Sequence, residues 1–281
     1  MHEPQSAGLL SARDLLADDQ LVDGPYSTGW RSLPCLVFNQ WMGGEVSLEL
    51  DRNRRLRVPD GHGFIVGSGF RHKLTLEGRD LRCRWVHLEA WLHGAVDLFT
   101  LIDLPVLVPQ IVADRLGGHC AALARERRGG DLLAEARRLA VNAAILAEVL
   151  ALADAGPLAA VASRLGPVQQ VLVWMRAHLD QPQTREDLSA VAGLSPTRFH
   201  YVFKEILGLA PMVYLRRLRL HQAQRLLVES DLAIGEIACA CGFADPFHFS
   251  RQFKAASGVA PLAYRRDHRS GLPGAGTARS E

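Results

Sequence analysis

Length, composition and charge narrow the class of protein before any motif is considered. The chain has 281 residues, 48% of them hydrophobic and 22% charged, which favours about two globular domains over a disordered chain. No run approaches the roughly 18 consecutive apolar residues that a membrane span needs. The first residues, MHEPQSAGLL, lack the basic stretch and apolar core of a secretory signal. We therefore expect a cytoplasmic protein.

The net charge of +2 is unevenly distributed. From Gly166 onward there are 14 Lys and Arg against 10 Asp and Glu, a net +4, whereas the preceding residues carry 18 against 20, a net −2. A modestly basic C-terminal region is compatible with a nucleic-acid partner, although an ordinary mixed surface gives the same count. Five cysteines are scattered without a CxxC pair, which favours buried thiols in a reducing compartment over disulfides or zinc.

Residues 1–19 are expected to form an N-terminal arm, and residues 20–112 have the texture of a β domain. Short apolar runs are interrupted by Gly, Asn, Asp and Pro. Val46, Leu48 and Leu50 alternate with polar residues, the period of two that is typical of a half-buried strand. Several short strands at this spacing predict a small sandwich or barrel.

Residues 113–165 are rich in Ala, Leu, Arg and Glu and predict a helical linker or dimerisation segment. Gly129 and Gly130 separate two helices. The second helix has apolar residues at near-helical spacing: Leu132, Leu139, Ala143, Leu146 and Leu150. Such a pair either caps the β domain or meets its copy in a second subunit.

Residues 166–268 read as helical throughout, and their first half contains clear helix boundaries. Thr184 with Asp187 three residues later predicts a capping box. Gly193 precedes a helix that begins near Pro196, and Gly208 ends it. The helix before them has one apolar face, made by Val168, Val171, Leu172, Met175 and Leu179.

The second half repeats this plan. An apolar helix is followed by Gly242, by Asp245 as a cap, by Pro246 at the start of a helix and by Gly258 at its end. FKEILGLAPMVYLRR, which begins at Phe203, returns as FKAASGVAPLAYRR. A helix pair joined by a glycine turn is typical of a helix-turn-helix, although one copy alone also suits an ordinary helical hairpin.

The segment between the copies, residues 212–230, contains no Gly or Pro. As a helix its nineteen residues span about 28 Å at ~1.5 Å each, against ~34–36 Å between successive major-groove faces of DNA. A rod of this length suits two recognition helices on one side of a duplex, with its arginines at phosphates.

The residues GFADPFHFSRQFK and GVAPLAYRR resemble the C-terminal signature of the AraC/XylS family of bacterial transcription regulators. The resemblance covers about residues 168–266. It implies two helix-turn-helix units joined by a long helix, binding to double-stranded DNA, and usually activation of transcription through contact with RNA polymerase. The expected fold is therefore α+β: a cupin-like N-terminal β-barrel, a helical segment, an all-α DNA-binding domain at 166–268, and a disordered tail at 269–281.

Matching positions give the residues expected to face DNA. Arg251 is expected to pair with guanine or to clamp a phosphate, and family members often carry Arg where this chain has Tyr201. Phe199, Phe203, Phe249 and Phe253 stand four apart and are expected in the core instead. The candidates in the first unit and the rod are Ser195, Thr197, Arg198, His200, Tyr201, Lys204, Arg216 and Arg219, and those in the second are Asp245, Pro246, Phe247, Ser250, Arg251 and Lys254.

The first 165 residues are expected to bind a small effector, to dimerise, or both. Gly61 and the later GSGFRH stretch loosely resemble the second cupin motif. Residues 41–58 contain no histidine, so we expect no metal or other cofactor. The candidate effector contacts are Trp30, Trp41, His72, Trp85 and His87. Aromatic and polar side chains together suggest a sugar or a similar hydrophilic molecule as the effector.

No nucleophile elbow, HExxH motif or phosphate-binding glycine loop is present, so an enzyme is not expected. Two alternatives stay open. One is a regulator that needs no ligand, and the other is a cupin-type binding protein or enzyme with a helical interaction domain.

Overall fold

The computed structural model describes residues 10–51, 54–92, 96–127, 129–153 and 165–269. The chain divides into two compact units. The N-terminal unit holds residues 9–92 and 97–155, and the C-terminal unit is built on residues 156–270. Within the described ranges, no helix is long and apolar enough to cross a bilayer.

The N-terminal unit contains two antiparallel sheets and two helices. The larger sheet has the order β1-β9-β4-β7-β11, with β10 beside β9, and the smaller has the order β2-β8-β5-β6, with β3 beside β8. The strands are β1 Leu10–Val22, β2 Tyr26–Ser27, β3 Arg31–Ser32, β4 Leu36–Met42, β5 Val46–Leu50, β6 Arg54–Val58, β7 Gly63–Val66, β8 Arg71–Leu76, β9 Leu81–Leu92, β10 Val96–Asp97 and β11 Leu107–Val108. A short 3-10 turn covers Leu98–Thr100.

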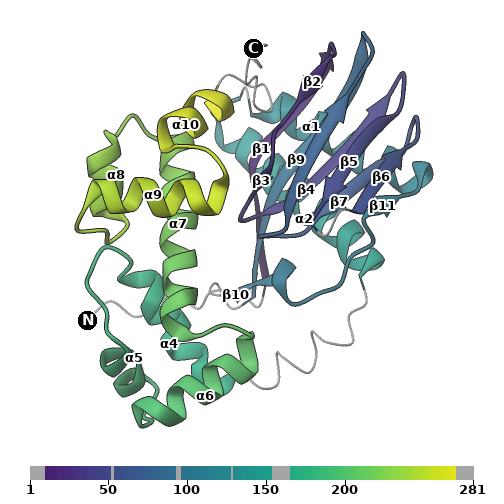
Figure 1. The fold of residues 1–281 in the computed structure, drawn as a ribbon. Helices are drawn as coiled ribbons and strands as arrows, with labels where there is room; N and C mark the ends of the chain where they lie inside the picture. The colour runs from purple at the N-terminus through teal and green to yellow at the C-terminus, as the bar shows by residue number, and fades with distance from the viewer. Residues whose placement is uncertain (1–9, 52–53, 93–95, 128, 154–164, 270–281) are drawn as a thin grey trace. The chain divides into compact units, whose positions relative to one another are not determined.

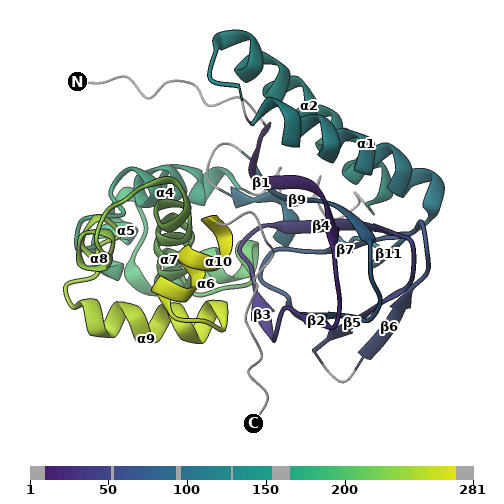
Figure 2. The ribbon, with the colours of Figure 1, turned by 90° about the horizontal axis from the view of Figure 1, so that it is seen from above.

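The sheets form two layers and do not close into the predicted barrel. Strand pairing stops at β1 and β11 in the larger sheet and at β6 in the smaller one, among the residues described. Figure 2 shows the sheets stacked, with α1 (Gln110–Glu126) and α2 (Leu132–Leu152) on the outer side of the larger sheet. Strand β4 is buried at six of its seven positions because both of its faces are covered.

The sheet begins earlier than the sequence predicts. Residues 10–19, assigned above to an arm, lie in β1, which pairs with β9 from Leu10 to Val22. One Arg and three Asp residues interrupt the apolar pattern of this strand. One of them, Asp14, is buried and points at the helices instead of solvent. Residues 1–9 of the predicted arm lie outside the described residues, as does the predicted tail beyond residue 269.

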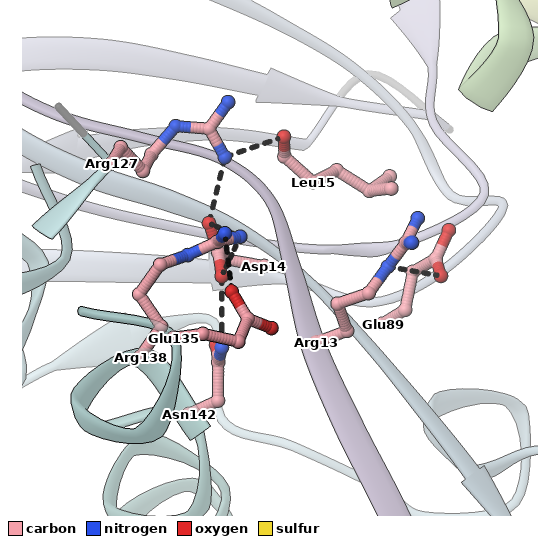
Figure 3. A network of polar contacts seen from close by, with 8 residues as sticks. All are labelled: Arg13, Asp14, Leu15, Glu89, Arg127, Glu135, Arg138 and Asn142. Carbon is pink, nitrogen blue, oxygen red and sulfur yellow. Dashed lines mark hydrogen bonds and ion pairs between the residues drawn. The ribbon is translucent and has the colours of Figure 1, made fainter. Parts of the chain in front are cut away.

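A buried acid ties the helix pair to β1 (Figure 3). The Asp14 carboxylate accepts hydrogen bonds from Arg127 at 2.7 Å, from Arg138 at 3.2 Å and from Asn142 at 2.8 Å. Its side chain is 0% exposed. A buried charge needs such partners. Packing of the helix pair on β1 therefore depends on Asp14 and on its three partners together.

The C-terminal unit contains seven helices within the described residues, and the long α7 stands between two groups of shorter ones (Figure 1). The helices are α4 Gly166–Ala177, α5 Arg185–Val191, α6 Pro196–Leu207, α7 Pro211–Glu229, α8 Ile234–Ala240, α9 Pro246–Ser257 and α10 Pro261–Arg269. The predicted rod is confirmed as an unbroken helix of nineteen residues. It begins one residue early because Pro211 occupies its first position.

The helix boundaries predicted from capping residues are confirmed. Thr184 and Asp187 form the capping box of α5. Gly208 and Gly258 end α6 and α9 with φ of 72° and 84°. Glycine is favoured there because it adopts positive φ without the strain of a Cβ atom.

Candidate nucleic-acid interface

Two side chains in the predicted interface set where the recognition helices begin. The Ser195 hydroxyl accepts a hydrogen bond from the Arg198 backbone N–H at 3.4 Å. The Asp245 carboxylate accepts from the backbone N–H groups of Phe247 and His248 at 2.9 and 3.0 Å. Both residues are exposed, but their oxygens are used as N-caps. These caps fix the residue at which α6 and α9 each begin.

The residues that repeat between the copies pack inside each unit. Phe199, Phe203 and Tyr214 form a row with ring centroids 5.5 and 5.6 Å apart. Phe249, Phe253 and Tyr264 form the equivalent row at 5.6 and 5.3 Å. All four phenylalanines are fully buried, as predicted. The repeated phrase therefore includes the aromatic core of each helical unit.

The outer faces of α6 and α9 carry most of the predicted contacts. Tyr201 is 72% exposed on α6 and Phe247 is 82% exposed on α9. His200 and Ser250 are half-buried. His248 is also exposed, and its alignment with Arg198 is the signal that would have added it to the prediction. The other exposed candidates are Thr197, Arg198, Lys204, Pro246, Arg251 and Lys254.

The exposed cations on these helices are available to an anionic partner. Among the described residues, the side chains of Arg198, Lys204, Arg251 and Lys254 form no ion pair. Arg216 on α7 is likewise exposed. Two helices that each present free cations beside an aromatic ring have the composition of a surface that contacts phosphates and base edges.

Arg219 differs from the phosphate contact that the sequence predicts. Its Nε atom donates to the Leu179 carbonyl at 3.0 Å and its Nη2 atom donates to the Gln181 carbonyl at 2.6 Å. Burial lowers the pKa of Arg219 from its ordinary value. The sequence places an arginine on the rod correctly, but only the fold shows that its fork is directed into the protein.

The predicted effector contacts in the N-terminal unit are distributed over both sheets. His72, on β8, is buried; its Nδ1 lies 3.2 Å from the Phe70 carbonyl and its Nε2 accepts from Arg31 Nε at 3.1 Å. Burial, with the Arg31 charge, lowers the pKa of His72 to about 3. The ring is therefore neutral at physiological pH, with its proton on Nδ1.

The larger sheet brings three other candidates together. Trp41 on β4 and Trp85 on β9 lie on adjacent strands and, by the register of the pair, on one face, because Trp41 pairs with Cys83 and Asn39 pairs with Trp85. The ring centroids of Trp85 and His87 are 4.9 Å apart. Among the described residues, the indole N–H groups of Trp41 and Trp85 and the amide nitrogen of Asn39 are buried without a hydrogen-bond partner.

Trp30 stands apart from this group. It lies between β2 and β3 beside the smaller sheet, 36% exposed, with the Arg71 guanidinium 5.1 Å from its ring centroid. Asn39 was missed from the sequence, although alternation along LVFNQWM places it on the face of Trp41. Within the described residues, no three His, Cys, Asp or Glu side chains are grouped so that they could hold a metal ion.

Comparison with known proteins places the C-terminal unit. A family model described as a helix-turn-helix domain matches residues 188–267. The HTH-type transcriptional activator RhaS of Klebsiella pneumoniae (strain 342) is 39% identical over 87 residues, 31% of this chain and 31% of that protein. A solved structure of a probable AraC family transcriptional regulator from Rhodopseudomonas palustris CGA009 is 30% identical over 37% of this chain and 97% of that one, with a TM-score of 0.34. The chain belongs to the AraC/XylS family.

The fold of this AraC/XylS protein is also similar, over most of the chain, to a solved structure of much lower sequence identity. ToxT from Vibrio cholerae covers 91% of the chain, and 98% of its own, with a TM-score of 0.56 at 11% identity. The likeness supports the layout of a β unit followed by a helical unit. The match to the curated relative named above spans about a third of that relative's length, so it characterises the helical unit.

Proposed function

We propose that this protein is a transcription regulator that binds double-stranded DNA through α6 and α9, placed in successive major-groove turns. The observation that carries the proposal is the duplicated unit itself. Helices α6 and α9 each bury two phenylalanines at equivalent positions, and each exposes free cations and an aromatic ring, Tyr201 or Phe247. The nineteen residues of α7 give a rod of about 28 Å, the order of the ~34–36 Å groove repeat.

The test is binding of the full chain to the DNA upstream of its own gene, measured by electrophoretic shift at several salt concentrations. Phosphate contacts release counterions, so log affinity should fall with log salt by roughly 0.9 for each contact. Arg251→Ala should cost ~1–3 kcal/mol on the specific site if the residue reads a base. Absence of a specific complex at every salt and ligand condition tried would contradict the proposal.

We also propose that the N-terminal unit binds a small effector rich in hydrogen-bond acceptors, such as a sugar. Buried N–H donors without partners are rare and call for a water or a ligand, and Asn39, Trp41 and Trp85 present three on one face of adjacent strands. Thermal shift of the full chain with neutral sugars and with small carboxylates tests this. Trp85→Phe, which keeps a ring but removes the indole N–H, should reduce the shift, and Trp30→Phe is the matched control.

The remaining partners proposed for this regulator are a second copy of the chain and RNA polymerase, with activation as the outcome. The name of the RhaS relative as an activator supports the last point. A truncated chain that starts at residue 166 and regulates like the full chain would favour the ligand-independent alternative. Stoichiometric metal in the purified protein would favour the cupin enzyme.

A further inference from the structure

Three parts of the C-terminal unit meet at one side chain. Arg219 lies in the middle of α7, and its guanidinium holds the carbonyls of Leu179 and Gln181, which lie in the loop between α4 and α5. Gly242, in the turn between α8 and α9, lies against both the Leu179 carbonyl and the Arg219 guanidinium. We call Arg219, Leu179, Gln181 and Gly242 the Arg219 joint. It connects the scaffold of the first helix-turn-helix to the turn of the second.

The loop that offers these carbonyls is held in place by its own contacts. Gln183 Nε2 donates to the His178 carbonyl at 2.6 Å. The His178 ring stacks on Trp174 with centroids 3.8 Å apart. Gln183 and Arg219 together donate to three carbonyls of the segment that follows α4, those of residues 178, 179 and 181. The partner of Arg219 is therefore a fixed surface and not a free loop.

Of the two turn glycines, only the one in the second helix-turn-helix takes part in the joint. Gly193 and Gly242 have nearly the same φ, 63° and 71°. A Cβ atom placed on Gly193 would have no atom within 4 Å, whereas one placed on Gly242 would overlap the Leu179 carbonyl oxygen and stand 2.7 Å from Arg219 Nη2. Replacing either glycine by alanine should strain the backbone equally, but only the change at Gly242 would cause a steric overlap. The two substitutions are therefore a matched pair.

We infer that Arg219 is a positioning residue that fixes the relation between the two helix-turn-helix units, and thereby the spacing of the two DNA elements they bind. This inference rests on the proposed function. Without the joint, the second helix-turn-helix keeps the packing of α8 and α10 on α7 but loses its contact with the α4–α5 loop, so we expect its orientation to be less tightly held. Inserting one base pair between the elements moves them about 3.4 Å apart and rotates them by about 34°, a mismatch that only an adjustable protein tolerates.

The experiment uses the full chain and sites selected from a random duplex library. The selected site is compared with versions that carry one or two extra base pairs between its elements. Wild type should lose about tenfold or more in affinity on the first insertion, the equivalent of one mismatched contact or more. Arg219→Met should bind the original site less tightly but lose under about threefold on insertion. Arg216→Met, a change at an exposed arginine of the same helix, should weaken all sites alike and keep the insertion penalty.

The outcomes separate the inference from the function it rests on. Failure of the wild type to select any sequence overturns the proposed function. Selection by wild type with an unchanged insertion penalty in Arg219→Met overturns the joint. Should Arg219→Met be unfolded by thermal melting, Arg219→Lys carries the same comparison, because one ammonium cannot reproduce the fork. Gly242→Ala should relax the spacing as well, and Gly193→Ala should not; equal effects of the two also overturn the joint.

Discussion

Phe247 is a phenyl ring left 82% exposed at the second position of α9, one helical turn before Arg251. An apolar ring at the start of a recognition helix, with cations around it, suits the 5-methyl group of a thymine in the major groove. This gives the second unit a specific chemistry to read, a thymine beside the guanine proposed for Arg251.

Replacing thymines of the selected site one at a time by deoxyuridine tests this reading. At one position the loss of the methyl group should weaken wild-type binding about fourfold, the worth of one buried apolar carbon. In Phe247→Ala the same replacement should have no effect, because the partner of the methyl group is gone. An equal loss in both proteins would show that another residue contacts that methyl group.

His72 predicts a pH dependence of the N-terminal unit. Its folded pKa of about 3 lies below the unfolded value of 6.5, so the unfolded chain binds the proton first as pH falls. The stability contributed by the neutral buried ring is complete above pH 6.5 and is lost as pH falls from there towards 3, with a slope of about 1.4 kcal/mol per unit at most.

Denaturant unfolding at pH 7.5, 6 and 5 checks this. His72→Gln keeps an acceptor for Arg31 and removes the titration, so its free energy of unfolding should fall less with acid than that of the wild type. His62→Gln is the control, since His62 is only partly buried. Parallel pH curves for wild type and His72→Gln would contradict the assignment.

At the scale of elements, residues close together in the sequence were sufficient to predict where the helices begin and end. Caps and turn glycines are local, because a side chain satisfies N–H groups two or three residues away. β1 was missed for the opposite reason. Its buried Asp14 is compensated by Arg127, Arg138 and Asn142, which lie more than 110 residues later. A prediction from local sequence patterns cannot include both Asp14 and partners so far along the chain.

Asp14→Asn tests how much the contact between β1 and the helices depends on this acid. Arg127 and Arg138, which are only 30% and 25% exposed, would both lose the buried charge that they share, and the free energy of unfolding should fall by roughly 3 kcal/mol. Glu135→Gln removes an exposed partner of the same Arg138 and should change it by at most about 1 kcal/mol. Chemical unfolding measures both, and equal small effects would show that the network is not a stabilising one.

At the scale of the whole molecule, α2 of the N-terminal unit has one face that no described residue of the chain covers. The buried side chains of α2 are Ala134, Asn142, Ile145, Leu146 and Val149. The stripe predicted from spacing is split, because Leu146 is buried whereas Leu132 and Leu139 are 91% and 58% exposed. The same helix thus caps the sheet with one face and leaves an apolar second face, which we propose meets a second copy.

Leu139→Glu tests the proposed dimer. A charge in the middle of an apolar helix pair is costly to bury, so the change should shift the full chain towards monomer in sedimentation experiments. Ile111→Glu, a similar change at a 71% exposed residue of α1, is the control and should leave the mass unchanged. A dimer of equal strength in both variants would place the interface elsewhere.

The sequence by itself determined the two-part organisation, the duplicated helical unit, the unbroken rod and the caps, because each depends on neighbours a few residues apart or on a phrase written twice. Tertiary structure decided what long-range contacts control. The strands form two open sheets, Asp14 is a buried anchor, and Trp41 and Trp85 share a face. Arg216 and Arg219 look alike in the sequence, as two arginines of one helix. The guanidinium of Arg219 is hydrogen-bonded within the protein, whereas Arg216 is exposed. Only the position of the α4–α5 loop, forty residues away along the chain, distinguishes them.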